Sequence, residues 1–383
     1  MNFCKPILSC CFLLSFKTLL LATDYQSSCE YMAAPQCSIL YSPPAAFDSC
    51  EPWQIFAQLD GIYWFTKEDN LDYAIKDHNP PNNFSNFQPK FPFGQLPNNN
   101  ARVINVAGSW DWGFRAKLGG YFADDIWDLT VVWTRFYTNK DSHVTAQPNE
   151  RLFTTMIFPF VPLSLTSLFG NSFFEAAVAS AKWTMHEDLV DLECGRDSWV
   201  GSCLSIRPYA AVRTSWIKQG LDVNYFKIPG LFSAAGVLLT PGLSEIDVKT
   251  KNHFWGIGPR AGVSSFWHLN DSWGIYGDIS ASLIWGYFNI HMQEVDIPDF
   301  VPMREDIKSD FSSQQANLDF RVGIQWEHYF CENKRKLMFA LGWDEQIWFK
   351  QNQLYMIFFN LPFDVKNGDL ILSGVTLSGR WEF

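Results

Sequence analysis

The chain has 383 residues and a formal net charge of −11 at pH 7. No basic block is present to neutralise phosphates, so the charge argues against a nucleic-acid partner. Charged residues make up 18% of the chain and aromatic residues 17%. Because soluble proteins carry about 25% charged residues, the composition argues against an ordinary cytosolic enzyme, and it is too apolar for a disordered chain.

The N-terminus predicts an export signal. Lys5 is followed by the apolar run "PILSCCFLLSFKTLLLA", which ends at about Ala22. This pattern is typical of a secretory signal peptide spanning residues 1–22, although Lys17 interrupts the apolar run. A membrane anchor helix is the alternative, and Lys17 and the short apolar length disfavour it. No Cys follows the small residues in the arrangement of a lipoprotein.

Alternating polarity predicts strands along most of the remaining chain. In "QANLDFRVGIQWEH" (315–328), for example, apolar side chains fall on one parity and polar side chains mostly on the other. A period of two is typical of a strand with two unlike faces. We expect ten strands, at about 53–66, 109–122, 126–138, 173–189, 203–218, 252–268, 273–290, 313–329, 336–350 and 369–383.

Short and long connections alternate between these strands. The short ones are "ADDI", "LNDS" and "CENKR", with a somewhat longer link at "ECGRDSWVG". The long ones cover about 67–108, 139–172, 219–251, 291–312 and 351–368. This alternation is typical of outer-membrane barrels, which have short periplasmic turns and long external loops. We therefore predict an all-β fold, a transmembrane antiparallel up-and-down β-barrel of about ten strands (10–12) over residues 53–383. The Cys-containing segment 23–52 would precede it in the periplasm.

Aromatic residues gather beside the short turns and at the C-terminus. They are Phe122, Trp127, Trp267, Trp273, Trp326, Tyr329, Trp381 and Phe383. Aromatic rings at the membrane interface form girdles around such barrels. The alternative, that these rings fill a core, does not explain their position beside turns. The apolar faces of the strands are therefore expected to contact lipid.

The polar faces then line the lumen with charges of both signs. The predicted basic lining residues are Arg115, Lys117, Arg207, Arg213, Arg260, Arg321 and Arg380, and the acidic ones are Asp60, Asp128, Asp278, Asp319, Glu327 and Glu382. Two interpretations stay open. These residues either select solutes in an open pore, or they pair across the lumen of a closed barrel, since small barrels tend to be filled by side chains.

Two apolar segments occur within the long loops. They are "LFTTMIFPFVPLSLTSLFG" (152–170) and "LFSAAGVLLT" (231–240). Exposed apolar patches usually mark contacts. These segments could fold inward as a constriction, pack between barrels, bind a host or lipid surface, or pack against other loops.

Six cysteines remain after removal of the signal peptide. They are Cys29, Cys37, Cys50, Cys194, Cys203 and Cys331. The predicted topology places all six on or near the oxidising periplasmic side, so disulfides are expected. Cys194 and Cys203 are the favoured intrachain pair because they lie near the ends of adjoining strands. Six cysteines permit 15 connectivities, and the sequence does not choose among them. A zinc site is disfavoured because no C-x-x-C motif occurs.

Catalytic motifs are weak. His186 and Asp188 in "HEDLVD" share a strand face, but no nucleophile accompanies them. The stretch "GIGPRAG" lacks the spacing of a phosphate-binding loop, and its glycines fit strand curvature or crowding in the lumen. We predict no enzyme activity, no metal and no cofactor.

Several stretches resemble a known family. "FAQLDGIYWFTKEDNLDYAI" (56–75) resembles the N-terminal signature of the Legionella-type major outer membrane proteins, a family also found in chlamydia-related bacteria. "VDLECGRDSWVGSCLSIRPYAAVRTSWIKQ" (190–219), "FWGIGPRAGVSSFWHL" (254–269) and "SLIWGYF" (282–288) resemble its internal blocks. The resemblance covers about 53–383. Cys194 departs from it, because relatives more often carry an apolar residue there.

The resemblance implies an exported outer-membrane barrel with porin-like, structural or surface-antigen roles. Phe383 resembles the signal read by the barrel assembly machinery, and the chlamydial relatives imply disulfide links to other envelope proteins or a homo-oligomer. The sequence therefore predicts a porin and structural envelope protein in contact with outer-membrane lipid. The alternatives are a surface adhesin or recognition protein with a closed lumen, and, less favoured, an outer-membrane enzyme.

Overall fold

The computed structural model describes residues 53–78, 101–122, 127–148, 150–156, 175–201, 203–228, 231–232, 238–240, 243–270, 272–298, 303–330, 335–356 and 364–383. Ten long strands form the fold: β1 (Trp53–Glu68), β4 (Ser109–Phe122), β5 (Trp127–Thr145), β8 (Val178–Arg196), β10 (Leu204–Ile228), β13 (Leu243–His268), β14 (Trp273–Pro298), β15 (Met303–Phe330), β16 (Arg335–Met356) and β17 (Asp364–Glu382). The short strands are β2 (Asp72–His78), β3 (Arg102–Asn105), β6 (Glu150–Thr154), β7 (Glu175–Ala176), β9 (Ser198–Trp199), β11 (Leu231–Phe232) and β12 (Leu238–Thr240). No helix in this part of the chain is long and apolar enough to cross a membrane.

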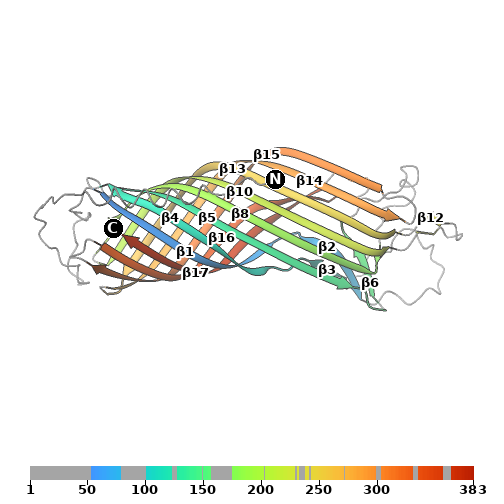
Figure 1. Cartoon of the computed structure of the whole chain (residues 1–383), viewed down its shortest axis with the longest axis horizontal. Helices are drawn as coiled ribbons and strands as arrows, with labels where there is room; N and C mark the ends of the chain where they lie inside the picture. The colour runs from blue at the N-terminus through green and yellow to red at the C-terminus, as the bar shows by residue number, and fades with distance from the viewer. Residues whose placement is uncertain are drawn as a thin grey trace, which may run out of the picture.

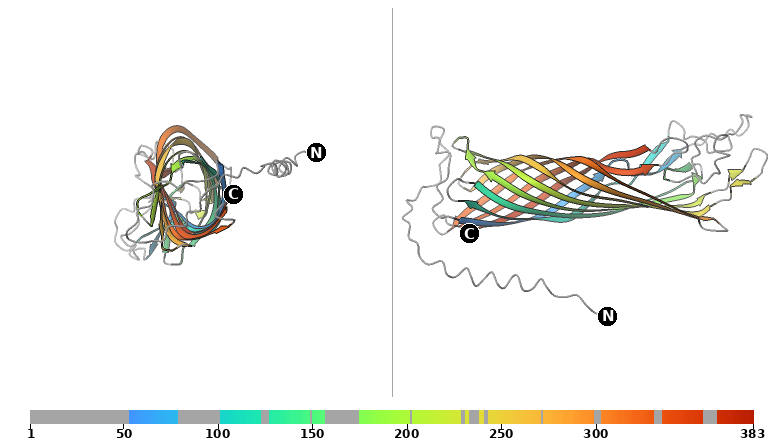
Figure 2. Two further views of the ribbon diagram at one scale, coloured as in Figure 1. Left: turned by 90° about the vertical axis from the view of Figure 1, so that its left-hand side faces the viewer. Right: turned by 90° about the horizontal axis from the view of Figure 1, so that it is seen from above.

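The ten long strands close into a barrel (Figures 1 and 2). Each pairs antiparallel with the next long strand in the chain, and β17 returns to pair with β1, so the ring has no free edge. The register at this closure places Ile62 opposite Thr376. Closure satisfies the backbone groups that an open sheet would leave unpaired. The prediction of an all-β, ten-stranded antiparallel barrel is confirmed.

The strands extend further than the sequence pattern indicates at the end of the barrel that carries the long loops. β10 continues to Ile228 and β15 begins at Met303, about ten residues beyond their predicted limits. The fourth strand was also placed too early, since β8 ends at Arg196 and not at residue 189. Beyond the apolar band the outward side chains are polar as well, so the contrast between the two faces fades and the period of two is lost.

The outward face carries an apolar band between two aromatic rings. Leu318, Phe320, Val322 and Ile324 are each 41–50% exposed, whereas Gln315 and its inward neighbours on β15 are buried. The ring beside the short turns was predicted. A second ring, not predicted, lies toward the long loops. Its outward members include Tyr63, Trp112, Trp133, Trp216, Trp255, Trp285, Tyr287 and Trp343. Two rings enclosing an apolar band are the surface expected of a barrel in a bilayer.

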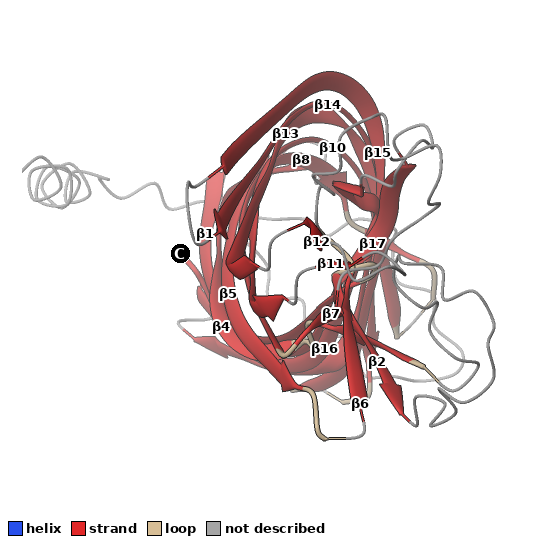
Figure 3. Ribbon diagram, turned by 90° about the vertical axis from the view of Figure 1, so that its right-hand side faces the viewer, coloured by secondary structure: helices blue, strands red, loops and turns tan. Residues whose placement is uncertain are grey.

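A small sheet lies at the long-loop end of the barrel (Figure 3). β2 pairs with β3 and β6, and β6 with β7. Leu71, Tyr73 and Leu152 of this region form one buried apolar cluster with inward residues of the barrel such as Trp183 and Phe288. The lumen is therefore lined by polar residues in the half nearer the short turns and by a mixture of apolar and polar residues in the half nearer the long loops. The sequence pattern did not indicate this inward apolar packing, which arises because the small sheet gives the upper wall an apolar surface to pack against.

The two apolar loop segments lie partly within the described residues. Leu152 and Phe153 are buried at the mouth of the barrel, which fits the inward-folding interpretation, while 157–170 lie outside the described residues. In the second segment β11 and β12 form a short hairpin. The predicted signal peptide and the segment 23–52 lie outside the described part of the chain.

Candidate functional site

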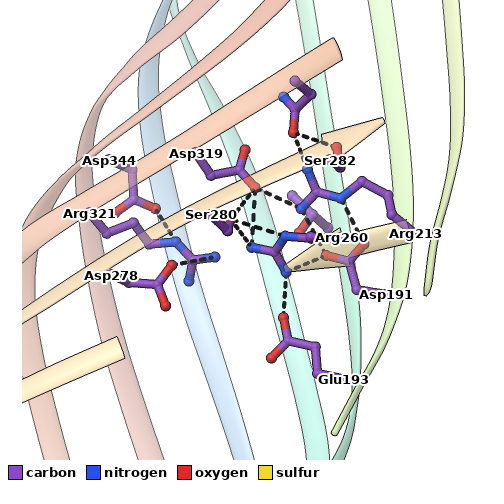
Figure 4. Close-up of polar contacts among 12 residues, drawn as sticks. Asp191, Glu193, Arg213, Arg260, Asp278, Ser280, Ser282, Asp319, Arg321 and Asp344 are labelled. Carbon is purple, nitrogen blue, oxygen red and sulfur yellow. Dashed lines mark hydrogen bonds and ion pairs between the residues drawn. The ribbon is translucent and has the colours of Figure 1, made fainter. Parts of the chain in front are cut away.

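The inward face of the barrel below the apolar cluster holds interlocked ion pairs (Figure 4). Arg213 on β10 pairs with Asp191 on the neighbouring β8 at 2.8 Å, and with Asp319 on β15 at 2.8 Å. β15 is three strands away from β10 around the ring. Arg213 also donates to the side-chain oxygen of Asn317. One guanidinium thus connects two separate parts of the wall.

Arg260 on β13 extends this network. It contacts Asp191 at 3.1 Å and Asp319 at 3.1 Å, and it also pairs with Glu193. Its Nε and Nη2 atoms donate to the Ser280 hydroxyl at 3.1 and 2.9 Å. Arg260 is only 2% exposed. Buried charges of this kind require full pairing, because an unpaired charge away from water is costly.

A second part of the network is centred on Asp344 of β16. Arg115 on β4 pairs with Asp344 at 3.0 Å and with Asp60 on β1 at 3.3 Å. Arg321 lies 4.0 Å from both Asp344 and Asp278. β4 and β16 are three strands apart around the ring, so Arg115 spans the lumen as Arg213 does.

Polar contacts continue toward the short turns. The Arg207 Nε donates to Asp128 at 2.6 Å, and Lys336 pairs with Glu327 at 2.7 Å. Arg380 pairs with Glu382 at 2.8 Å and donates to the Tyr121 hydroxyl. The lower lumen is therefore also occupied by paired groups.

Above the ion pairs, two hydrogen bonds cross between distant strands. The Trp348 Nε1 on β16 donates to Glu187 on β8 at 2.8 Å, and these strands lie five places apart in a ring of ten. The Gln219 amide on β10 donates to Glu68 on β1 at 3.0 Å, four places away. Side chains from opposite walls thus meet in the middle of the barrel.

Little space remains within the ionic network. A cavity of about 10 Å³ lies among Arg115, Arg213, Asp319, Arg321 and Asp344. A single water needs roughly 10–15 Å³ of such volume. The side chains around this cavity therefore leave room for about one water.

Buried acceptors without a partner accompany the upper polar layer. They include Glu68 Oε2, Glu187 Oε2, Gln219 Oε1 and Asn252 Oδ1. Glu68 lies at the long-loop end of β1, above the apolar band. Burial raises the pKa of its carboxyl to about 8, and the Gln219 amide opposes this shift.

The residues predicted to line the lumen all lie on the inward side of their strands. Arg115, Arg213, Arg260, Arg321, Asp60, Asp278 and Asp319 meet in the network, while Arg207, Asp128, Glu327, Arg380 and Glu382 lie nearer the short turns. Lys117 has no carboxylate within 4.0 Å among the described residues. The network residues Asp191, Glu193 and Asp344 were missed, as were the residues of the two crossing bonds, Glu187, Trp348, Glu68 and Gln219.

Asp191 and Glu193 were missed because the fourth strand was ended at residue 189. The alternation continues beyond it: Leu189, Asp191 and Glu193 are buried, and Leu192 and Cys194 are exposed. This signal was available in the sequence.

The favoured disulfide between Cys194 and Cys203 is not formed. Cys194 is an exposed free thiol on β8, opposite Leu129 and Ala210 of the flanking strands. Cys203 is disulfide-bonded, so Cys194 is not its partner. The prediction failed because β8 runs through Cys194, which places its side chain on the outward face of the barrel. Cys29, Cys37, Cys50 and Cys331 lie outside the described residues.

The weak catalytic candidate, His186 with Asp188, lies on the outward face of the barrel wall. His186 Nε2 is 3.2 Å from Asp188 on the outward face of β8. Trp133 Nε1 donates to the same carboxylate at 3.4 Å, and Arg135 lies 3.8 Å from it. The pocket beside this pair is lined by Trp133, His186, Asp188, Val190, Trp216 and Lys218, a set without a hydroxyl or thiol nucleophile.

Solved outer-membrane proteins show weak likeness to the chain. The outer membrane protease OmpT from Escherichia coli is 8% identical, with 86% of this chain and 96% of that chain covered and a TM-score of 0.39. A FadL homologue from Pseudomonas aeruginosa is 10% identical over 87% of this chain and 90% of that chain, with a TM-score of 0.24. The Pseudomonas putida toluene transporter TodX is 6% identical, with the same coverage and a TM-score of 0.21. No curated protein matches the chain significantly.

A family model gives a stronger result. It describes the Legionella pneumophila major outer membrane protein precursor and matches residues 48–383. This range contains every strand of the barrel. The match agrees with the closed ring, the apolar band and the two aromatic rings. The chain is therefore a protein of the bacterial outer membrane and belongs to the family of the Legionella pneumophila major outer membrane protein precursor.

Proposed function

We propose that this protein is a structural, surface-presenting barrel of the outer membrane whose lumen is closed to solutes. The observation that carries the proposal is the set of contacts between distant strands. Arg115 to Asp344, Arg213 to Asp319 and Trp348 to Glu187 each join strands three to five places apart. A pore selective for charge needs its lining groups to face water and passing ions, whereas these groups face one another.

The apolar cluster supports the same conclusion. Trp64, Trp183 and Trp348 are each 1% exposed or less, and they pack inside the barrel with residues of the small sheet. A hydrated ion would have to cross this apolar layer after leaving the ionic network. The porin expectation is therefore less well supported than the alternative of a closed lumen.

A non-catalytic role is part of the proposal. The one histidine–carboxylate pair considered as a candidate, His186 with Asp188, faces outward. Its carboxylate is already engaged by Trp133 and Arg135. A His-activated hydroxyl or thiol nucleophile must lie within hydrogen-bond reach of the base, and the residues lining this pocket include neither group.

Covalent linkage within the envelope would complete a structural role. The described chain begins at Trp53 and ends at Phe383 on the short-turn, periplasmic side of the barrel, and the Phe383 amide donates to the Ile55 carbonyl at 2.9 Å. Cys203, in the link between β8 and β10, is on the same side but is already disulfide-bonded, so the links proposed here fall to the other periplasmic cysteines. We propose that periplasmic cysteines join this barrel to other envelope proteins or to further copies of itself.

Liposome swelling tests the closed lumen. The full chain, refolded and inserted into phosphatidylcholine liposomes, should give no faster swelling in arabinose or glycine than empty liposomes give. Insertion is verified by protease protection and by heat-dependent mobility on gels. Swelling rates that rise with protein density and fall with solute size would reject the proposal in favour of a porin.

A further inference from the structure

The outward wall of β5, β8, β10 and β13 carries a basic surface directly above the second aromatic ring. The strand register aligns Tyr137, His186, Lys218 and His253 as one row across the four strands. One row further out, Lys251 lies opposite Gly220. We use "basic row" for the three basic residues of the first row, His186, Lys218 and His253, together with Lys251 of the next row. This surface faces away from the ionic network and is unrelated to the closed lumen.

A pocket of about 270 Å³ lies at the lower edge of the basic row. Its lining consists of Trp133, His186, Asp188, Val190, Trp216 and Lys218. The rings of Trp133 and Trp216 belong to the second aromatic ring, which marks the level of the bilayer interface. The pocket therefore opens where the headgroups of the extracellular leaflet lie.

The positive charge of this surface is only partly balanced. Asp188 is the carboxylate in the pocket, and it is already shared between His186 at 3.2 Å and Arg135 at 3.8 Å. Lys218 and Lys251 have no carboxylate within 4.0 Å among the described residues.

Below the pocket the wall is apolar. Val131, Leu192, Val212 and Ile257 are 46–49% exposed, on the same four strands. This strip lies at the depth of the acyl chains. A ligand that fills both regions must have an anionic head and hydrocarbon tails, connected at the level of Trp133 and Trp216.

We propose that the basic row and the pocket beneath it form a binding site for the phosphorylated headgroup of a lipid in the extracellular leaflet. Lys218 and Lys251 contact the phosphate, the two indoles pack beside the headgroup, and the acyl chains lie along the strip below. Ammonium groups suit this role because they bind phosphate as mobile point charges. Each lysine near a membrane surface contributes roughly fivefold to the binding of an anionic lipid.

Native mass spectrometry of the full-length barrel tests the proposal. The protein is released from zwitterionic detergent micelles with bisphosphorylated lipid A as the probe, and the fraction carrying a retained lipid is measured. We expect one retained lipid for the parent protein and a loss of about tenfold or more in apparent affinity for Lys218→Gln/Lys251→Gln. The double Lys→Arg variant should retain binding. The control Lys67→Gln removes a lysine on the outward face of β1, which is paired with Asp69 at 2.8 Å, and should bind as the parent does.

Two further measurements distinguish binding of a phosphorylated lipid from binding of free phosphate. Phosphatidylcholine, which has no net charge, should be retained at least tenfold less well, and millimolar inorganic phosphate should not displace lipid A. Equal retention of phosphatidylcholine, displacement by inorganic phosphate, or unchanged binding by the double Lys→Gln variant would each overturn the proposal. Dimers that form in place of lipid adducts would assign the surface to a second copy of the chain and would also overturn it.

Discussion

The Trp348 indole donates to the Glu187 carboxylate across the full width of the barrel, at 2.8 Å and between strands five places apart. Both residues are buried, with 0% exposure. This bond lies at the boundary between the ionic network below and the apolar cluster above. It shows that the walls meet at their centre, so the barrel is held together through its interior as well as around its circumference.

Trp348→Phe should destabilise the barrel. The substitution removes the donor and leaves Glu187 buried with one more unpaired oxygen, which costs about 1–3 kcal/mol in the free energy of unfolding. Urea unfolding in detergent micelles, followed by far-UV circular dichroism, measures the change. Trp343→Phe is the control, because Trp343 lies on the same strand and faces outward with 42% exposure. A loss at Trp343 equal to that at Trp348 would contradict the role given to the crossing bond.

Arg213→Met should cost more than any substitution on the outer surface. It leaves Asp191 and Asp319 with Arg260 as their remaining close partner in the network, and breaking a buried ion pair costs about 3–5 kcal/mol. Arg135→Met, which removes an exposed partner of Asp188 at 3.8 Å, should cost about 1 kcal/mol or less. The same unfolding measurement compares the two variants. Similar losses for both would mean that the network does not hold the walls together.

Glu68→Gln should change how stability depends on pH. The folded-state pKa of Glu68 is about 8, above its ordinary value of 4.5. The folded protein therefore binds this proton more tightly than the unfolded chain does, so the associated stability is full below pH 4.5 and is lost as pH rises through 8. The melting temperature of Glu68→Gln relative to the parent should rise between pH 6 and 9. Glu305→Gln, at an exposed position on β15, should show no such trend. If the melting-temperature difference between Glu68→Gln and the parent stayed constant over this pH range, the Glu68 carboxyl would not be protonated in the folded protein.

Gly258→Ala should disturb the pairing of β13 with β14. A Cβ atom at Gly258 would lie 2.0 Å from the Leu283 carbonyl oxygen, so the backbone has to move. Overpacking of this kind costs about 1–3 kcal/mol. At Gly61 the nearest atom to an added Cβ is 4.0 Å away, so Gly61→Ala should be close to neutral. Comparable heat-dependent gel mobility for the two variants would be inconsistent with this close approach.

Substitutions of Cys194 and Cys203 should have different effects on gel mobility. Cys194→Ser should leave the mobility of the protein on non-reducing gels unchanged, because Cys194 is a free thiol. Cys203→Ser should change it, because Cys203 is disulfide-bonded. The measurement compares membranes prepared with a thiol-blocking reagent, with and without reductant. A mobility change for Cys194→Ser alone would reverse this assignment.

Much of the fold could be predicted from the sequence, because the contrast between two faces is strong wherever one face contacts lipid. Leu318 to Ile324 illustrate this on β15, and the number of strands and their closure follow from the same pattern. The upper barrel could not be predicted in this way. There both faces carry mixed side chains, and the inward residues pack against β2 and β6, whose position depends on contacts far apart in the chain.

The lumen residues were found by parity, but their pairing was not. Parity places Arg213 and Asp319 inward without stating that β10 and β15 approach across the bore. Whether the lumen is open depends on the diameter and on side-chain length, and both are three-dimensional properties. Cys194 shows the reverse case, since a strand ended too early placed an outward-facing thiol in a turn.

Planar-bilayer recording of the full chain tests the central claim, that paired side chains close the lumen. Folding and insertion are verified first by heat-dependent mobility. We expect no stepwise current in 1 M KCl at moderate voltage from the parent protein. Reproducible unitary conductance steps, present in the parent and altered by Arg213→Met, would contradict the claim and show that ions pass between the network residues.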